Sequence, residues 1–425
     1  MCLIIDSFQF NIASGSAMSL IIVALTVAGV LYALYGILIA LAGIRNRPAL
    51  KIAATQRRFA VLIPAHNEAE VIGPLLNSLE GQGYPRSDFD VYVSCDHCTD
   101  ATVSVARAHG AVVLERFGQT QRGKTWNLRW ALGQIPLEDY EGVAVIDADN
   151  LVHPNFLSAM NAYLEQHPQT QAVQGVLDVK NPNDNWVTAA SAMSYWFTNR
   201  FVQYAKSSLG LSCMLGGTGM MIRSACLRRI GWRLESLVDD LELTVLLNLE
   251  GNSVGWNEHA IIYDEKPTEL SVSLRQRQRW MQGHFWVLAR YAPALLGCFV
   301  RTRRLLYLDT LLVLVGPAIT LIGLLAAIGQ FAQFGRAWLE STLINETTMV
   351  AWLVSPLLIG ALHAVVGPSM RAGKLSFKYL IWLPAYIAFG LTWFYPIVRG
   401  LLNARDQGHW VKTAHNRSIS SSELR

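Results

Sequence analysis

Asp147 and Asp149 are spaced so that they could bind one divalent cation together. The motif Asp147-Ala148-Asp149 directly follows the hydrophobic run at residues 143–146, which predicts two carboxylates where a buried strand opens into a loop. Mg²⁺ binds few protein carboxylates and completes its octahedron with water and phosphate oxygens, so the pair suits a cation that bridges a diphosphate. A lone D-x-D also occurs as a loop cap or a solvated pair, and the surrounding motifs favour the metal.

A second acidic pair, Asp239-Asp240, could supply a general base. A hydroxyl group is a poor nucleophile, and a carboxylate that accepts its proton during attack makes it a better one. The residues that follow the pair look helical, so the other reading is a helix that carries acids in its first turn. On the sequence alone, either carboxylate could serve as the base.

Gln276, Arg279 and Trp280 combine an amide, a cation and an indole just before the strongly apolar last third of the chain. Arginine binds diphosphate oxygens through forked, charge-assisted hydrogen bonds. An indole face stacks on the apolar face of a pyranose. The alternative is a helix at a membrane interface with a snorkelling arginine and a tryptophan at the headgroups.

Three weaker signals lie elsewhere in the chain. Lys124 follows a flexible loop and precedes a helical segment, so it could meet a phosphate or be a solvated charge. Gly217 and Thr218 lie in a glycine-rich stretch, at residues 216–219, that allows a backbone to approach a ligand or makes a tight turn. His66 and His153 lack paired ligand spacing and are expected to be ordinary loop or surface histidines.

The composition indicates an integral membrane protein. Of the 425 residues, 52% are hydrophobic and 16% are charged, whereas soluble globular proteins carry roughly 25% charged residues. The mean hydropathy is +0.27. The net charge of +4 arises from basic residues near apolar spans, so cytoplasmic membrane flanks explain it and no nucleic-acid partner is expected.

Cys95 and Cys98 have C-x-x-C spacing among the six cysteines. A structural zinc site needs a second ligand pair at suitable spacing, and none stands out. A redox pair is the other reading. We expect reduced thiols at the end of a buried strand in a cytosolic domain.

Residues 59–264 alternate between strand-like and helix-like runs. Strands are predicted at residues 59–64, 89–94, 111–114 and 143–146, and helices at 69–79, 101–109 and 125–132. This alternation predicts a largely parallel sheet with helices on both faces. Ligands of such sheets bind beyond the carboxyl ends of the strands, where the acidic motifs fall.

Residues 19–44 form an apolar run that exceeds the roughly 20 residues needed to cross a bilayer. Its length and the lack of a basic n-region argue against a cleaved signal peptide. The basic residues that follow place this end in the cytoplasm. Further candidate spans are residues 305–328, 350–366 and 379–402, and Pro384 and Pro396 predict a kink or partial re-entry in the last.

The remaining segments near the membrane give conflicting orientations. Residues 268–289 are predicted to form an interfacial helix, or two short ones. An acidic loop at residues 330–349 suits the outside and a basic loop at 371–378 suits the inside. Four full spans would place the C-terminus outside, which the basic tail disfavours. Either the charge rule fails or one C-terminal segment does not cross.

The motifs together resemble those of family 2 glycosyltransferases. More narrowly, they resemble the membrane-embedded branch that contains cellulose, chitin, hyaluronan and poly-N-acetylglucosamine synthases. The matching motifs are Pro64-Ala65-His66-Asn67-Glu68, Asp96-His97-Cys98-Thr99-Asp100, Asp147-Ala148-Asp149, Val238-Asp239-Asp240 and Gln276-x-x-Arg279-Trp280. The resemblance covers about residues 59–290 and the flanking spans. Each motif is weak alone, and their shared order makes the resemblance specific.

The resemblance implies a GT-A fold, an α/β domain with a Rossmann-like mixed sheet, and an inverting reaction with a UDP-sugar and Mg²⁺ or Mn²⁺. It implies nucleotide contacts by Pro64, Glu68, Asp96, Lys124, Asp147, Gln276 and Arg279. It implies metal contacts by Asp149 and Asp147, and acceptor contacts by Gly217, Thr218, Asp239 and Trp280. The family's T-E-D reads Val238-Asp239-Asp240 here, which maps the base onto Asp240 and leaves its supporting contacts open. A tail motif at residues 410–413 would bring Lys412 near the site.

These inferences predict the domain organisation. We expect an N-terminal segment and span at residues 1–50, a cytosolic GT-A domain at 51–267, interfacial helices at 268–304, about three spans at 305–402 and a polar tail at 403–425.

The expected function is elongation of a β-linked polysaccharide from UDP-glucose or UDP-N-acetylglucosamine. The enzyme would be a multi-pass protein of the plasma (inner) membrane with a cytoplasmic catalytic domain, surrounded by membrane lipids. Its product could leave through the spans, helped by a homo-oligomer or an export partner. The alternative is a non-processive transferase that glycosylates a membrane lipid. A non-catalytic transporter or scaffold with a decayed domain is disfavoured because Asp149 and Asp240 are both present.

Overall fold

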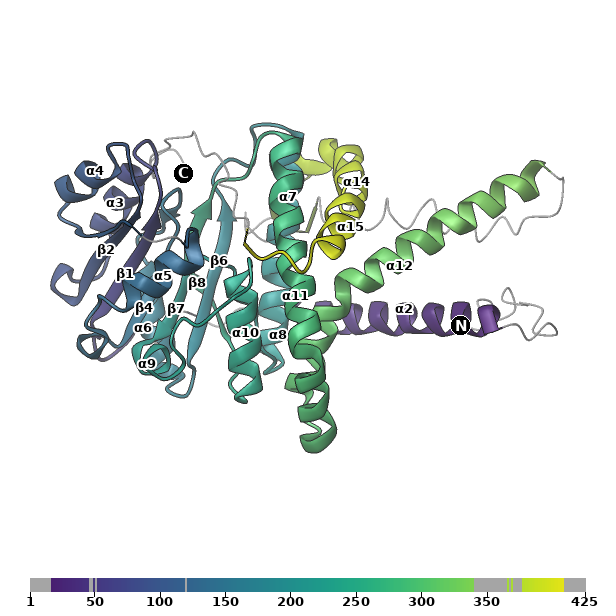
Figure 1. Ribbon diagram of the computed structural model, residues 1–425, viewed down its shortest axis with the longest axis horizontal. Helices are drawn as coiled ribbons and strands as arrows, with labels where there is room; N and C mark the ends of the chain where they lie inside the picture. Colours follow the sequence, from purple (N-terminus) through teal and green to yellow (C-terminus); the bar gives the residue numbers. More distant parts are fainter. Residues whose placement is uncertain are drawn as a thin grey trace.

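A computed structural model describes residues 17–45, 49, 52–118, 121–339, 365–366, 368–369 and 377–408 (Figure 1). The span expected at residues 350–366 lies outside this part of the chain, apart from its last two residues. The tail motif at residues 410–413, with Lys412, also lies outside it.

The region expected to form the α/β domain contains an eight-stranded mixed sheet with the order β3-β2-β1-β4-β7-β6-β8-β5. The strands are β1 (Phe59–Ala65), β2 (Phe89–Asp96), β3 (Val112–Arg116), β4 (Gly142–Val145), β5 (Leu151–Val152), β6 (Ala172–Val179), β7 (Met220–Arg223) and β8 (Gly255–Asp264). The strands expected from the sequence are confirmed as β1 to β4, which pair in parallel.

The expectation of a largely parallel sheet is confirmed for β1 to β4 and for the pair β6 and β8, and it is wrong for two short strands. Strand β7 runs antiparallel to both β4 and β6, and β5 runs antiparallel to β8. The short strands β5 and β7 carry little periodicity of their own, so their direction follows from long-range pairing. This reversal matters for the site, because the N-terminal end of β7 lies beside the C-terminal end of β4, where Val145 pairs with Met220.

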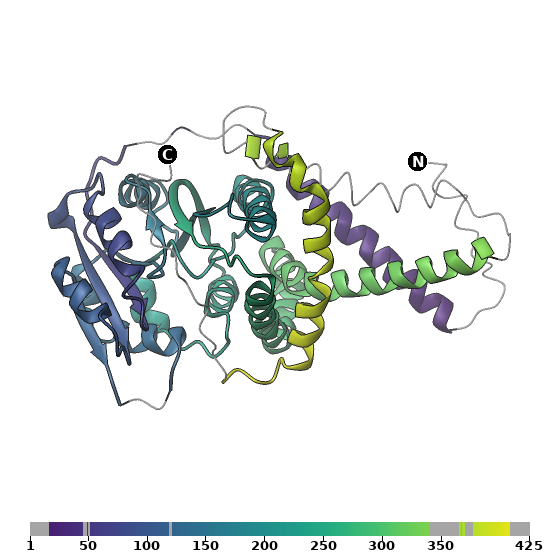
Figure 2. The same ribbon diagram turned by 90° about the horizontal axis from the view of Figure 1, so that it is seen from above.

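Helices cover both faces of the sheet (Figures 1 and 2). Alternate residues of β1 separate the two cores: Phe59, Val61 and Ile63 face one, and Ala60 and Leu62 face the other. The first core includes α3 (Ile72–Glu80), α4 (Thr102–Ala108) and α6 (Phe156–Gln166). The second includes α5 (Lys124–Leu132), α9 (Ser224–Ile230) and α10 (Asp239–Leu249). Short 3₁₀ turns span Arg86–Asp88 and Leu137–Asp139.

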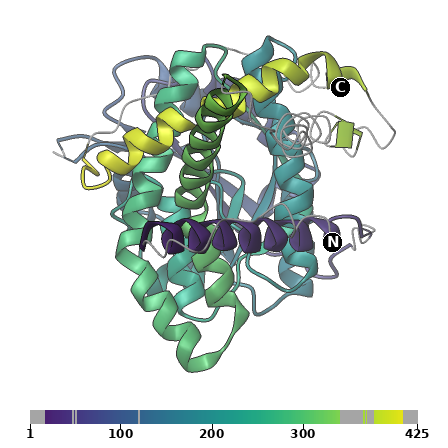
Figure 3. The same ribbon diagram turned by 90° about the vertical axis from the view of Figure 1, so that its right-hand side faces the viewer.

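A second layer of helices packs beside the sheet and extends away from it (Figures 1 and 3). It contains α2 (Ala17–Ala42), α7 (Trp186–Thr198), the π-helical turn Asn199–Tyr204, α8 (Ala205–Ser208), α11 (Leu270–Thr302), α12 (Leu305–Leu339), the 3₁₀ turn Lys378–Trp382, α14 (Leu383–Leu391) and α15 (Phe394–Leu402). Within the described residues, Leu305–Gly323 and Lys378–Leu402 are long and apolar enough to cross a membrane, and the apolar helix Val27–Ala42 is shorter.

Two expected boundaries in this layer change. The segment expected to end near residue 289 is one continuous helix, α11, which runs through Pro293 to Thr302. It continues because its second half packs on neighbouring helices, with Leu295 fully buried in a cluster that also holds Leu314 of α12. Residues 330–339, expected to begin an outside loop, extend α12 instead.

The kink expected in the last apolar segment corresponds to an interruption between two helices, whereas its partial re-entry stays a prediction. Helices α14 and α15 are separated at residues 392–393, and Pro384 and Pro396 lie in the first turn of each helix. Proline is tolerated there because the N–H that it lacks would have no partner within the helix.

A buried ion pair joins three of these helices. The Lys206 Nζ atom of α8 lies 2.9 Å from the Asp309 Oδ2 atom of α12, and the two side chains are 3% and 4% exposed. The Tyr35 hydroxyl of α2 donates to the other Asp309 oxygen. Three helices that are distant in sequence, α2, α8 and α12, are therefore linked through one carboxylate.

Candidate active site

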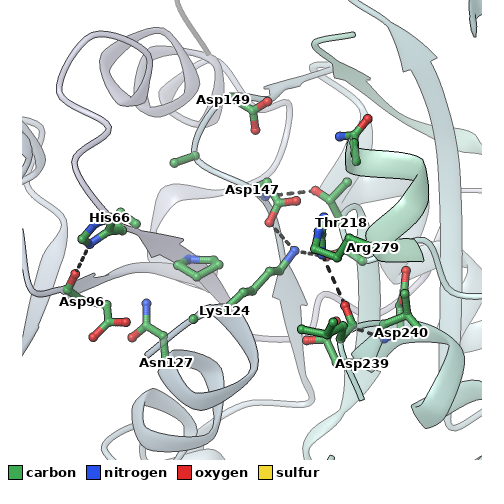
Figure 4. A pocket seen from close by; sticks show the side chains of 18 of the residues that line it. His66, Asp96, Lys124, Asn127, Asp147, Asp149, Thr218, Asp239, Asp240 and Arg279 are labelled. Atoms are coloured by element: carbon green, nitrogen blue, oxygen red, sulfur yellow. Dashed lines mark hydrogen bonds and ion pairs between the residues drawn. The ribbon is translucent and has the colours of Figure 1, made fainter. Parts of the chain in front are cut away.

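A cleft of about 400 Å³ opens at the carboxyl ends of β1, β2 and β4 (Figure 4). Every site residue expected from the sequence lines it: Pro64, Glu68, Asp96, Lys124, Asp147, Asp149, Gly217, Thr218, Asp239, Asp240, Gln276, Arg279 and Trp280. The structure thus brings together residues from β1 through α11. The individual roles of these residues stay predictions.

Asp96, at the end of β2, is held by a buried arginine. The Arg116 Nη1 atom donates to Asp96 Oδ1 at 2.6 Å, and Arg116 is 3% exposed. The His97 Nδ1 atom lies 2.7 Å from the same oxygen. Sequence reasoning missed Arg116, because it belongs to β3 and meets Asp96 only through the parallel pairing of β2 and β3. The Asp96 Oδ1 atom is therefore held by two side chains, and this fixes the orientation of the whole carboxylate, including Oδ2.

The lack of ligand spacing predicted that His66 is an ordinary loop or surface histidine, and this prediction is wrong. His66 lines the cleft directly after β1, and its Nδ1 atom lies 2.6 Å from the Asp96 carbonyl oxygen. The sequence signal for this placement was its position inside the Pro64-Ala65-His66-Asn67-Glu68 motif rather than any ligand spacing.

Lys124 occupies the centre of the cleft, at the start of α5 (Figure 4). Its Nζ atom is ion-paired with Asp147 and donates to the Gly217 carbonyl oxygen at 2.7 Å. Burial lowers the pKa of Lys124, but the surrounding carboxylates, Asp147 first, outweigh it, so the pKa is raised overall. The lysine therefore stays cationic in the cleft, as a phosphate ligand must.

Asp149 lies deeper than Asp147 and is 6% exposed. Its Oδ1 atom accepts from the Asn150 side-chain amide at 3.2 Å, and its carbonyl oxygen accepts from Lys180 at 3.1 Å. Asn150 also accepts from the Thr218 hydroxyl at 2.6 Å. The D-x-D loop is thus fixed from several sides.

Asp239 and Asp240 form the first turn of α10, opposite Asp147 across Lys124 (Figure 4). Burial, with a further contribution from Asp239, raises the pKa of Asp240 from 3.8 to about 7. Burial also raises the pKa of Asp239, although Lys124 opposes this. The alternative interpretation, that these acids lie in the first turn of a helix, is also confirmed. The Leu241 N–H donates to Asp240 Oδ1 at 2.8 Å. The two readings are compatible, and the raised pKa favours a proton-accepting role near neutral pH.

Gly217 allows the backbone to approach the acids closely. Its φ is +78°, and a Cβ atom there would lie 3.2 Å from Asp240 Oδ2. The loop that contains Gly217 reaches the acids because β7 runs antiparallel to β4. It is held there by the Thr218 hydroxyl, which accepts from the Asp147 N–H at 3.0 Å.

We expect Gly217→Ala to lower kcat about tenfold, because the new methyl group combines backbone strain with contact against Asp240. The matched control is Gly110→Ala, which has a similar φ of +69° but open space around the added Cβ. Steady-state turnover of both variants is compared with that of the unchanged protein. Equal kcat for the two variants would contradict the steric argument and leave only backbone strain.

Gln276, Arg279 and Trp280 face the cleft from α11, since residues i, i+3 and i+4 share one side of a helix. The Arg279 Nη1 atom donates to the Leu237 carbonyl oxygen at 3.3 Å. Trp280 also packs against a cluster that contains Val238 and Leu314 and against one that contains Ile397. The wall of the cleft near Asp240 is therefore continuous with the apolar helices.

Sequence reasoning also missed Asn127, Tyr195 and Asp264, which line the cleft. Asp264 ends β8 and is ion-paired with Lys266. These residues carry no motif of their own, and the topology of the sheet brings them to the cleft.

Comparison with known proteins identifies the family. Residues 56–283 match the family model described as glycosyltransferase like family 2. The chain is 27% identical over 353 residues to a beta-monoglucosyldiacylglycerol synthase of Nostoc sp., covering 75% of this chain and 74% of the relative. It is 27% identical over 301 residues to an N-acetylglucosaminyltransferase of Rhizobium leguminosarum bv. viciae, covering 68% and 70%.

A solved structure shares the fold. The mannosyltransferase PcManGT of Pyrobaculum calidifontis, in complex with GDP-Man and Mn²⁺, matches with a TM-score of 0.58 and 19% identity, over 89% of this chain and 97% of that one. The GT-A-like mixed sheet expected from the sequence is thereby confirmed. Because the family model spans more than half of the sequence, the chain belongs to glycosyltransferase family 2 and is a hexosyltransferase.

Proposed function

We propose that this enzyme transfers a hexose from a UDP-sugar, with inversion, to a hydroxyl group of a membrane lipid. The observation that supports the lipid acceptor most directly is the position of Trp280. It lines the cleft and also packs against clusters shared with α12 and α15, the apolar helices. A hydroxyl at the headgroup end of a lipid can then reach Asp240 while its acyl chains stay among apolar side chains.

In the proposed reaction, Asp240 accepts the proton of the acceptor hydroxyl while its oxygen attacks the anomeric carbon. The bond to UDP breaks on the opposite face, so the anomeric configuration inverts and the electron pair leaves with the diphosphate. A carboxylate whose pKa is about 7 is well matched to this step near neutral pH. Lys124 and Arg279 provide positive charge for the diphosphate along the same cleft.

The residues of the cleft fit a divalent cation that binds together with the nucleotide. Within the described part of the chain, no three His, Cys, Asp or Glu side chains converge on one point. Mg²⁺ needs only one or two carboxylates when phosphates and water complete its shell. Asp149 would be its main protein ligand, because Asp147 is paired with Lys124. When bound, the cation supplies neutralisation of the charge on the leaving diphosphate.

A growing glycan, the acceptor favoured by the sequence, is the second candidate. The resemblance to an N-acetylglucosaminyltransferase supports it. We place the lipid first because the synthase of Nostoc sp., whose name contains a diacylglycerol product, matches over a larger share of this chain. A lipid acceptor also requires neither an export path nor a homo-oligomer or partner that builds one.

We further propose that the enzyme is a multi-pass protein of the plasma (inner) membrane with its catalytic cleft in the cytoplasm. The apolar stretches Leu305–Gly323 and Lys378–Leu402 support insertion. The basic residues after α2 support a cytoplasmic sheet domain.

The acceptor proposal is tested with full-length enzyme in nanodiscs that contain diacylglycerol, using radiolabelled UDP-glucose and UDP-N-acetylglucosamine in parallel. Label that becomes extractable into organic solvent supports the lipid acceptor. Label that appears only in a high-mass aqueous product supports the glycan acceptor and overturns the lipid proposal. Nanodiscs without diacylglycerol are the matched control, and Asp240→Asn enzyme shows the background.

A further inference from the structure

The loop that leads into the two acids is held by side chains from different parts of the chain. The N–H groups of Glu235 and Ser236 both donate to Glu242 Oε2 at 2.8 Å. The next N–H group, of Leu237, donates to Gln407 Oε1 at 2.7 Å. Glu242 belongs to α10 itself, whereas Gln407 comes from the segment after α15, 170 residues away along the chain.

Gln407 is itself fixed on α11 and on the end of α15. Its Nε2 atom donates to the Ala404 carbonyl oxygen at 2.8 Å and to the Gln282 carbonyl oxygen at 3.4 Å. In return, the Gln282 side-chain amide donates to the Asp406 carbonyl oxygen. The side chain of Gln407 is therefore oriented by its donors, and its acceptor oxygen points at Leu237.

The helices around this contact leave little room for adjustment. A Cβ atom on Gly400 of α15 would lie 2.5 Å from the Met281 Cβ atom of α11. A Cβ atom on Gly283 of α11 would lie 2.6 Å from the Val238 Cγ2 atom. The backbone of α11 thus touches α15 on one side and the loop of the acids on the other, so a displacement of α15 is transmitted to that loop.

We propose that Gln407 is a positioning residue that holds the backbone at Leu237 and thereby aims Asp240 at the acceptor. Leu237 is the point where two supports meet, because its N–H binds Gln407 and its carbonyl oxygen accepts from Arg279. Gln407 also lines a small cavity of about 50 Å³ with Lys124 and Arg279, directly behind the cleft. The inference rests on the proposed role of Asp240 as the base.

The test uses full-length enzyme and the variant Gln407→Leu, which keeps the size of the side chain but removes its acceptor. We expect kcat to fall about tenfold, since one positioning hydrogen bond is lost, while KM for the UDP-sugar stays within about twofold. The matched control is Gln166→Leu, whose side-chain amide donates to Ala162 on its own helix, α6. That helix packs in the core on the other face of the sheet from α10. The kcat of this control should equal that of the unchanged enzyme.

A double variant separates positioning from a merely structural role. If Gln407 acts through Asp240, Gln407→Leu lowers residual turnover of Asp240→Asn enzyme by less than about twofold, because effects that share one residue are not additive. A further tenfold loss in that background, or an unchanged kcat in Gln407→Leu alone, would overturn the inference. An Asp240→Asn enzyme with normal turnover would instead overturn the proposed base, so the two failures are distinguishable.

Discussion

Replacing Asp240 by asparagine will lower kcat by about 10²- to 10⁴-fold, the range that a positioned general base contributes. Asparagine keeps the shape of the side chain but cannot accept the proton of the attacking hydroxyl. The carboxylate that it removes faces the Gly217 loop and lies in the cleft beside Lys124. Turnover is measured by release of the nucleotide diphosphate, with a radiolabelled donor for the slow variant.

The fold should survive this substitution. The negative charge of Asp239 raises the pKa of Asp240, so removing the Asp240 charge relieves repulsion between the two carboxylates. We therefore expect a melting temperature no lower than that of the unchanged enzyme. Asp239→Asn is the companion variant, and a larger loss of kcat in it than in Asp240→Asn would assign the base to Asp239.

The same carboxylate predicts how the activity depends on pH. The pKa of Asp240 is raised to about 7, mainly by burial, so the proton-accepting form dominates only above that pH. As pH falls through 7, kcat/KM should decline towards tenfold per unit. This acidic limb should vanish in Asp240→Asn. If kcat/KM of the unchanged enzyme instead declines only near pH 4, the carboxylate that titrates is exposed and has an unshifted pKa.

Replacing Lys206 by methionine will destabilise the protein by about 3–5 kcal/mol, the effect of leaving a buried charge without its partner. The Asp309 carboxylate is 4% exposed and would keep the hydrogen bond from Tyr35 but lose its ion pair. Because this carboxylate joins α8, α12 and α2, the loss should also loosen the packing of these three helices against one another. Denaturation of the detergent-solubilised enzyme measures the effect.

Two comparisons make the stability prediction specific. The double variant Lys206→Met with Asp309→Leu should recover most of the lost stability, since both charges leave the interior together. Arg229→Met breaks an ion pair with Glu250 of similar length, 2.8 Å, but exposed on both sides, and should change stability by less than about 1 kcal/mol. If the single and double variants at Lys206 were equally unstable, the packing of its side chain rather than its charge would be responsible.

The chemistry-bearing residues could be predicted from the sequence because each signal is local. Asp147 and Asp149 follow a recognisable buried strand, and Gln276, Arg279 and Trp280 have the spacing that places them on one helix face. The strands β1 to β4 and their helices were equally readable, since hydrophobic periodicity marks a strand or helix without knowledge of its neighbours.

The supports of the site could not be predicted because they join residues that are distant in sequence. Arg116 reaches Asp96 across a strand pair, and Gly217 reaches Asp240 because β7 runs opposite to β4. Neither strand direction nor register is encoded in a short window, and both are selected by burial over the whole sheet.

The sequence by itself determined which side chains carry charge, which could accept a proton and where apolar helices begin. Tertiary structure alone decided that Gln407 holds the loop of the acids and that Lys206 meets Asp309 inside the helix layer. The reason is that local periodicity reports which face of an element is buried, whereas the partner against that face is chosen only when distant elements pack together.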